Sequence, residues 1–181
     1  SGTYTQLNTR VLGNLKTIRD YAAANEEWGT YLAATVLRAF TYQVLVDCYE
    51  QVPYTEAMNT AYPSPKYDDG LTVYQGVIAE IDDALAKASE SDLVCSNFLF
   101  PSAGAQEWVR FANALKLKMY MRISGVADVQ SAVDALVAEG NFPTSDVAWM
   151  GCWTDEGGKA NPYFSEEFGS YTSVQKNVSL N

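Results

Sequence analysis

Residues 106–124 read QEWVRFANALKLKMYMRIS and predict one helix over about residues 105–123. Apolar side chains recur three or four residues apart in this stretch, which places them on a single helical face. They are Trp108, Phe111, Ala112, Leu115, Met119 and Ile123. Leu117 and Tyr120 lie off that face, so we expect other parts of the chain to cover this helix on more than one side.

Two further helices are predicted upstream, over about residues 5–24 and 27–49. In the first, an apolar stripe is formed by Leu7, Val11, Leu15, Ile18 and Ala22. The second is apolar around most of its circumference, so we expect it to be central and buried on several sides. Cys48 lies inside this apolar pattern and is therefore expected to be a buried free thiol.

Two more helices are predicted, one over about residues 72–88 and one over about residues 127–139. Thr72 and Gln75 fit a capping box at the start of the first, with Asp69 as a competing cap. Gly140 stands where a glycine commonly ends a helix. Residues 53–70 read as a long ordered loop, and long loops in compact domains tend to be functional or mobile.

This pattern predicts an all-α fold of tetratricopeptide-like stacked helical hairpins with long loops and about five main helices. Small residues allow close helix approach at Ala33, Ala34, Ala39, Ala112 and Ala114. We expect a helical scaffold over residues 1–140. Residues 141–181 are expected to be a loop-rich C-terminal segment of the same domain.

Composition excludes several classes of function. The 181 residues carry a net charge of −10, which argues against a nucleic-acid partner and against adhesion of the domain itself to anionic lipid. The chain has no His, so a Ser-His-Asp or Cys-His catalytic arrangement within it is excluded. The adjacent acidic residues lack the alternating spacing of an EF-hand. We therefore expect no enzyme activity, no cofactor and no metal site.

The segment over residues 146–168 is the candidate ligand-binding region. It combines aromatic rings with Gly, Asn and Pro on a stretch of weak periodicity. Flat rings can stack on sugar faces while polar side chains hydrogen-bond the hydroxyl groups. The candidate ligand-binding residues are Trp149, Trp153, Asn161 and Tyr163. The alternative is that these rings cover the ends of the helical core.

The same 106–124 stretch resembles the characteristic helix of the SusD-like branch of the SusD/RagB family. Residues 38–49, the VPYTEA run at 52–57 and the segment from Tyr67 to Ala88 resemble the family pattern in the same order, and Asn161-Pro162-Tyr163 also has a counterpart. Glu50-Gln51 departs from the common Gly-Asp. The resemblance covers about residues 28–168.

The resemblance implies a tetratricopeptide-like lipoprotein at the surface of the outer membrane of Bacteroidetes-type bacteria. Its partners would be a SusC-like TonB-dependent transporter and an oligosaccharide or other nutrient. Family members are longer, so we expect this chain to be a fragment or truncated form that lacks the lipid anchor. No family binding residue is carried over by motif. Two alternatives stay open: a helical protein-interaction scaffold without its own ligand site, and a peptide rather than a glycan ligand.

Overall fold

The computed structural model of this chain describes residues 2–101, 104–148, 153–154, 156 and 159–161. Two compact units are distinguished, Ser1–Asp146 and Val147–Asn181. All helices of the described residues belong to the first unit. The predicted boundary at residue 140 stays a prediction.

The first unit is all-α, which confirms the predicted fold class. An N-terminal helix is continuous through α1 (Gly2–Thr5), the π-helix η1 (Gln6–Val11) and α2 (Leu12–Ala24). The remaining helices are α3 (Trp28–Tyr49), α4 (Gly70–Lys87), α5 (Gln106–Ile123) and α6 (Gln130–Glu139). Within the described ranges, β-structure is limited to two isolated bridges, Val52 with Asp68 and Leu93 with Gly104.

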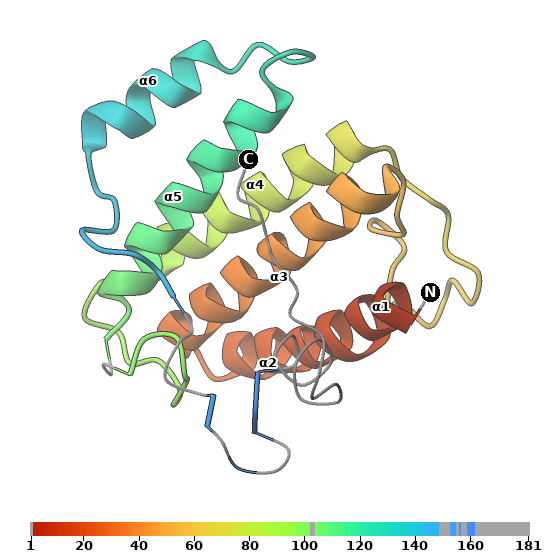
Figure 1. The fold of residues 1–181 in the computed structure, drawn as a ribbon, viewed down its shortest axis with the longest axis horizontal. Helices are drawn as coiled ribbons and strands as arrows, with labels where there is room; N and C mark the ends of the chain where they lie inside the picture. The colour runs from red at the N-terminus through yellow and green to blue at the C-terminus, as the bar shows by residue number, and fades with distance from the viewer. Residues whose placement is uncertain (1, 102–103, 149–152, 155, 157–158, 162–181) are drawn as a thin grey trace, which may run out of the picture. The chain divides into compact units, whose positions relative to one another are not determined.

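Consecutive helices run antiparallel, so the unit is a series of helical hairpins (Figure 1). Helix α3 packs against α2, α4 and α5, and α6 packs against α5. Small residues allow this close packing: Ala33, Ala34, Ala39 and Ala112 are all buried. Gly76 on α4 is also required, because a Cβ atom there would lie within 2.4 Å of the Tyr54 ring.

The core is centred on α3 and on the inner face of α5. Tyr42 and Leu45 of α3 are fully buried, and Trp108 of α5 retains 1% exposure. The Phe100 ring meets the Trp108 ring edge-on, with their centroids 5.1 Å apart. The sequence expectation that α3 is central and covered on several sides is therefore confirmed.

The predicted stripe of the N-terminal helix is partly wrong. Val11 and Ile18 are exposed by 36% and 39%, whereas Leu12 is fully buried. A π-helix has more residues per turn than an α-helix, so η1 breaks the 3.6-residue period on which the expected stripe relied. About two turns after Leu12, Arg19 rather than its neighbour Ile18 faces inward, and its guanidinium pairs with Glu80 on α4.

Three local predictions have definite outcomes. Cys48 is exposed rather than buried, because it lies on a side of α3 that other helices leave uncovered. Asp69 caps α4: its carboxylate accepts hydrogen bonds from the backbone N–H and the hydroxyl of Thr72, at 3.0 and 2.6 Å. Gly140 has a φ of +67° at the end of α6, as a C-terminal glycine cap requires.

Candidate functional site

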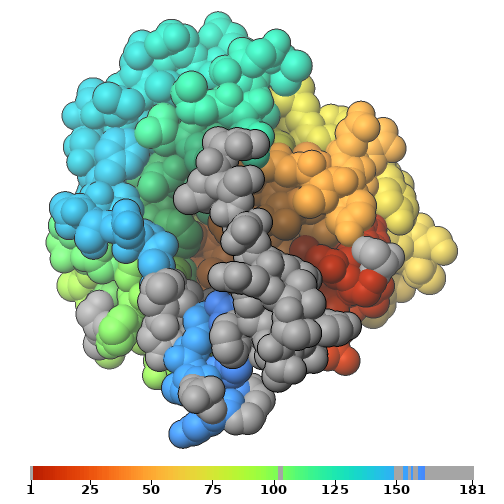
Figure 2. Space-filling model, in the orientation of Figure 1, coloured from red at the N-terminus to blue at the C-terminus, as the bar shows by residue number. Residues whose placement is uncertain are grey.

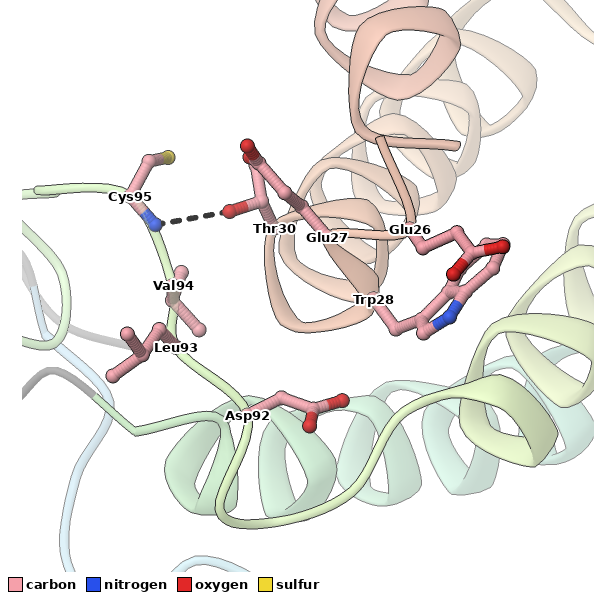
Figure 3. A pocket seen from close by; sticks show the side chains of 8 residues that line it. All are labelled: Glu26, Glu27, Trp28, Thr30, Asp92, Leu93, Val94 and Cys95. Carbon is pink, nitrogen blue, oxygen red and sulfur yellow. Dashed lines mark hydrogen bonds between the residues drawn. The ribbon is translucent and has the colours of Figure 1, made fainter. Parts of the chain in front are cut away.

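A cavity of about 480 Å³ lies where the α2–α3 turn faces the loop that follows α4 (Figure 3). The turn contributes Glu26, Glu27, Trp28 and Thr30. The loop contributes Asp92, Leu93, Val94 and Cys95. The cavity thus combines one indole ring with carboxylates, a hydroxyl and a thiol.

Backbone contacts fix the two walls of this cavity. The Cys95 backbone N–H donates to the Thr30 hydroxyl at 3.0 Å, the hydrogen bond drawn in Figure 3. Gly29 brings α3 directly against the loop, since a Cβ atom there would come within 2.4 Å of the Leu93 carbonyl oxygen. Asp92 is held by the Ser89 N–H, which donates to its carboxylate at 2.9 Å. The loop is therefore anchored at two places beside the N-terminus of α3.

The lining offers hydrogen-bond acceptors and an aromatic surface. Within the described part of the chain, the Glu26 and Glu27 carboxylates make no ion pair. The Lys87 ammonium lies 5.6 Å from the centre of the Trp28 ring, so one aromatic face is partly engaged. Such a lining suits a hydroxyl-rich ligand and disfavours an anionic one.

The strongest electrostatic feature is a cluster outside this cavity, centred on Glu80 of α4. Its carboxylate pairs with Arg19 of α2 at 3.0 Å and with Arg38 of α3 at 2.9 Å. The Tyr54 hydroxyl also donates to it, at 2.8 Å. Burial and the neighbouring Glu80 charge raise the pKa of the Tyr54 phenol. The cluster ties two helices and a loop to α4, which indicates a structural role.

The sequence-predicted ligand residues fall in the second unit. Trp153 is 39% exposed, and Asn161 is also exposed. Lys159 pairs with Glu156, and the Thr154 N–H donates to the Lys159 carbonyl at 3.0 Å, which forms a local turn. Trp149 and Tyr163 lie outside the described residues. Whether these four side chains share a site therefore stays a prediction.

Sequence reasoning missed the cavity beside Trp28. Trp28 fits the apolar helical period of residues 27–49, which by itself indicates a core residue. The available signal was its position directly after the acidic pair Glu26-Glu27, at the start of a helix. The facing loop could not be paired with it, because the contact joins residues more than 60 positions apart.

The described residues contain neither a metal-binding cluster nor a membrane-spanning helix. No group of three or more Cys, Asp or Glu side chains there is arranged to hold a metal ion. None of the helices in that part of the chain is long and apolar enough to cross a membrane.

Comparisons with known proteins identify the family of this chain. A search of curated proteins found no match. A SusD homologue from Bacteroides fragilis superposes with a TM-score of 0.72 at 18% identity, over 87% of this chain and 36% of that one. A SusD/RagB family protein from Bacteroides thetaiotaomicron gives 0.71 at 24% identity, over 86% and 34%.

A chitin-binding protein gives a TM-score of 0.62 at 23% identity, over 78% of this chain and 32% of that chain. At these identities the three likenesses show a shared fold. This chain spans about a third of the length of each of these relatives. The SusD-like family model, described as starch-binding and associating with the outer membrane, matches residues 1–177. The chain therefore belongs to the SusD-like family.

Proposed function

We propose that this chain is part of a nutrient-binding protein at the surface of an outer membrane, which captures glycans for a SusC-like TonB-dependent transporter. The observation that carries the proposal is the match of residues 1–177 to a family of starch-binding proteins that associate with the outer membrane. The superposition on SusD homologues supports the same scaffold. A lipid anchor in the parent protein would provide its only membrane attachment.

The proposed activity is binding without chemical conversion of the ligand. The chain lacks His, the commonest general base, and has no recognisable catalytic motif. Its net charge of −10 favours neutral or cationic ligands over anionic ones. Neutral oligosaccharides fit this preference.

For ligand contact we propose Trp149, Trp153, Asn161 and Tyr163 of the second unit. Exposure of Trp153 and Asn161 supports a role at the surface. The cavity beside Trp28 supplies a further indole and several acceptors in the first unit. Trp153→Ala is expected to weaken glycan binding. Val126→Ala, at an exposed apolar position in the α5–α6 turn, is expected to leave it unchanged.

The test is affinity electrophoresis in gels that contain soluble starch, followed by calorimetric titration with maltoheptaose and chitohexaose. Retarded migration and a saturable heat signal are expected. The parent protein is also expected to copurify with its transporter. Failure of both the chain and its parent to bind any glycan in a broad panel would overturn the proposal.

A second candidate function is a helical scaffold that docks another protein. Leu37 and Phe40 favour it, since these apolar side chains are 36% and 39% exposed in the middle of the central helix α3. Lys118 of α5 lies 5.6 Å from the centre of the Phe40 ring, which gives this surface a mixed apolar and cationic character. Transporter copurification that is lost in Phe40→Asp while glycan binding persists would favour docking through this surface.

A further inference from the structure

A groove separate from the Trp28 cavity runs between the N-terminal helix and the loop over residues 53–67. In Figures 1 and 2, this yellow loop lies beside the red N-terminal helix at one edge of the first unit. The groove has two lobes of about 350 and 470 Å³. Ala57 and Met58 line both lobes, so the two lobes are neighbours along the same loop.

Hydrogen bonds to Asp68 order the loop that forms one wall of the groove. Val52 and Asp68 exchange two backbone hydrogen bonds, at 3.2 and 3.0 Å, which close the loop at its base. The Asp68 carboxylate then accepts from the backbone N–H groups of Tyr54 and Thr55, at 3.2 and 2.8 Å. A loop of this length with joined ends and internal anchors is a compact Ω-type loop. Such a wall needs little ordering when a ligand arrives.

The helix wall is formed where the helix is irregular. Asn8 and Thr9 line the first lobe, and both belong to the π-helix η1. π-Helical turns are rare and frequently occur at functional sites. Met58, between the lobes, has a φ of +56°, which few non-glycine residues adopt. Both walls therefore depart from regular backbone geometry at the groove itself.

The first lobe is aromatic and uncharged. Tyr4 and Tyr67 face it together with Pro53 and Pro65. The Tyr4 hydroxyl donates to the Tyr67 hydroxyl at 3.3 Å, which links the two rings across the groove. Tyr67 is 59% exposed, so much of its surface remains available for contact.

The second lobe is polar, with the side chains of Thr55, Asn59 and Thr60. The side-chain Oδ1 of Asn59 accepts from the Ala61 N–H at 3.0 Å, and its side-chain NH2 group makes no hydrogen bond to any other described residue. Among the described residues, Lys16 is the only charged one that lines either lobe, and it pairs with Asp20 at 2.5 Å. The groove therefore offers aromatic faces, amide and hydroxyl groups, and little net charge.

We infer that this groove binds a neutral oligosaccharide chain, with one sugar ring against Tyr67 and the next hydroxyl groups on Asn59 and Thr60. The inference rests on the proposed function and locates a contact surface for it. Aromatic lining with a few placed polar groups is the usual character of such sites, and the lobe volumes fall in the usual range. An anion would find no uncompensated cation in the lining.

A proline-rich peptide is the competing occupant, since extended proline helices also dock in aromatic grooves. Such a peptide would use the Tyr and Pro surfaces of the first lobe. Its proline residues have no N–H donors, so it would form few hydrogen bonds with the amide and hydroxyl groups of the second lobe. The hydroxyl-bearing ligand is therefore favoured.

The test compares the 181-residue chain with three variants by calorimetric titration of maltoheptaose, chitohexaose and a proline-rich decapeptide. Tyr67→Ala is expected to weaken glycan affinity about tenfold, the typical effect of losing a central aromatic contact. Tyr67→Phe is expected to retain most of the affinity, because it keeps the ring. Tyr21→Ala is the matched control, since Tyr21 is 60% exposed on α2 outside the groove.

Each result decides the inference. Glycan binding that is weakened by Tyr67→Ala and unchanged by Tyr21→Ala supports it. Equal glycan affinity in the wild type and Tyr67→Ala would show that the groove is not the binding site, and the proposed function would be unaffected. Absence of glycan binding by the wild-type chain overturns the groove, and the same absence in the parent protein over the broad panel overturns the proposed function. If only the peptide binds, and its binding depends on Tyr67, the groove is a peptide site and the inferred oligosaccharide ligand is wrong.

Discussion

The helical core and the loops that border its cavities are stabilised in different ways. Around α3 and α5, apolar side chains recur with the helical period, and Trp108 is 1% exposed. Between α3 and α4, the loop over residues 53–67 is anchored by a few carboxylates, chiefly Asp68 and Glu80. The core thus spreads its stability over many contacts, whereas the loop concentrates it in a few polar ones. Single substitutions should reveal this difference.

The largest effect is expected for Trp108→Ala. Removal of a fully buried indole should lower the free energy of unfolding by about 3–5 kcal/mol. Urea denaturation followed by circular dichroism measures it. Trp153→Ala is the control, because Trp153 is 39% exposed and should cost much less. Equal shifts in the two urea midpoints would contradict the distinction between core and surface.

Glu80→Gln is expected to come next. The substitution leaves two guanidinium groups, those of Arg19 and Arg38, without their anionic partner, and their side chains are only 16% and 12% exposed. A loss of roughly 2–3 kcal/mol is expected, below the value for a fully buried pair because Glu80 is partly solvated. Asp82→Asn is the comparison and should cost less, because it removes a single ion pair, with Lys116, in which the carboxylate side chain is 51% exposed. A cost no larger than that of Asp82→Asn would argue against a central structural cluster.

Asp68→Asn is expected to cost about 1–2 kcal/mol at neutral pH and to loosen the loop. Burial raises the pKa of Asp68, but hydrogen bonds from Thr55 and Tyr54 outweigh it and lower the pKa overall. This stabilisation is therefore complete above the unfolded pKa of about 3.9 and disappears as pH falls through the lower folded pKa.

Urea midpoints of wild type and Asp68→Asn should therefore converge as the solution becomes acidic. Limited proteolysis at neutral pH should cut the variant faster within residues 53–67. A difference between the two midpoints that stays constant into strong acid would show that the Asp68 charge is not what anchors the loop.

The smallest effect, and the only stabilising one, is expected for Glu26→Gly. Glu26 has a φ of +57° just after α2, where glycine is the favoured residue. Relief of this strain, partly offset by the greater chain entropy of glycine, should raise stability by about 0.5–1 kcal/mol. A thermal unfolding scan measures it. An unchanged or lower midpoint would indicate that the Glu26 side chain makes a stabilising contact at the Trp28 cavity.

The sequence predicted the core because helical periodicity is a local signal. The helix over residues 106–123 and the central helix over residues 28–49 both follow from spacing alone. The N-terminal stripe failed at Val11 and Ile18, because a π-helix changes the residues per turn without a marked sequence signal. The predicted burial of Cys48 was wrong because an apolar pattern does not show which side of a helix the neighbouring elements leave exposed.

The cavities could not be predicted for a different reason. The Trp28 cavity needs Thr30 beside Cys95, and the groove needs Tyr4 beside Tyr67. Both contacts join distant segments through loops, where no periodic pattern constrains the pairing. The ligand-binding candidates that the sequence did indicate remain proposals: Trp149, Trp153, Asn161 and Tyr163.

The most direct test of the division between folding core and binding loops is a calorimetric glycan titration of Tyr67→Ala, with its urea midpoint measured beside that of the wild type. We predict that the variant keeps the wild-type midpoint and binds maltoheptaose or chitohexaose about tenfold more weakly. Wild-type affinity in Tyr67→Ala, or a fall in its urea midpoint as large as that of Trp108→Ala, would contradict this division.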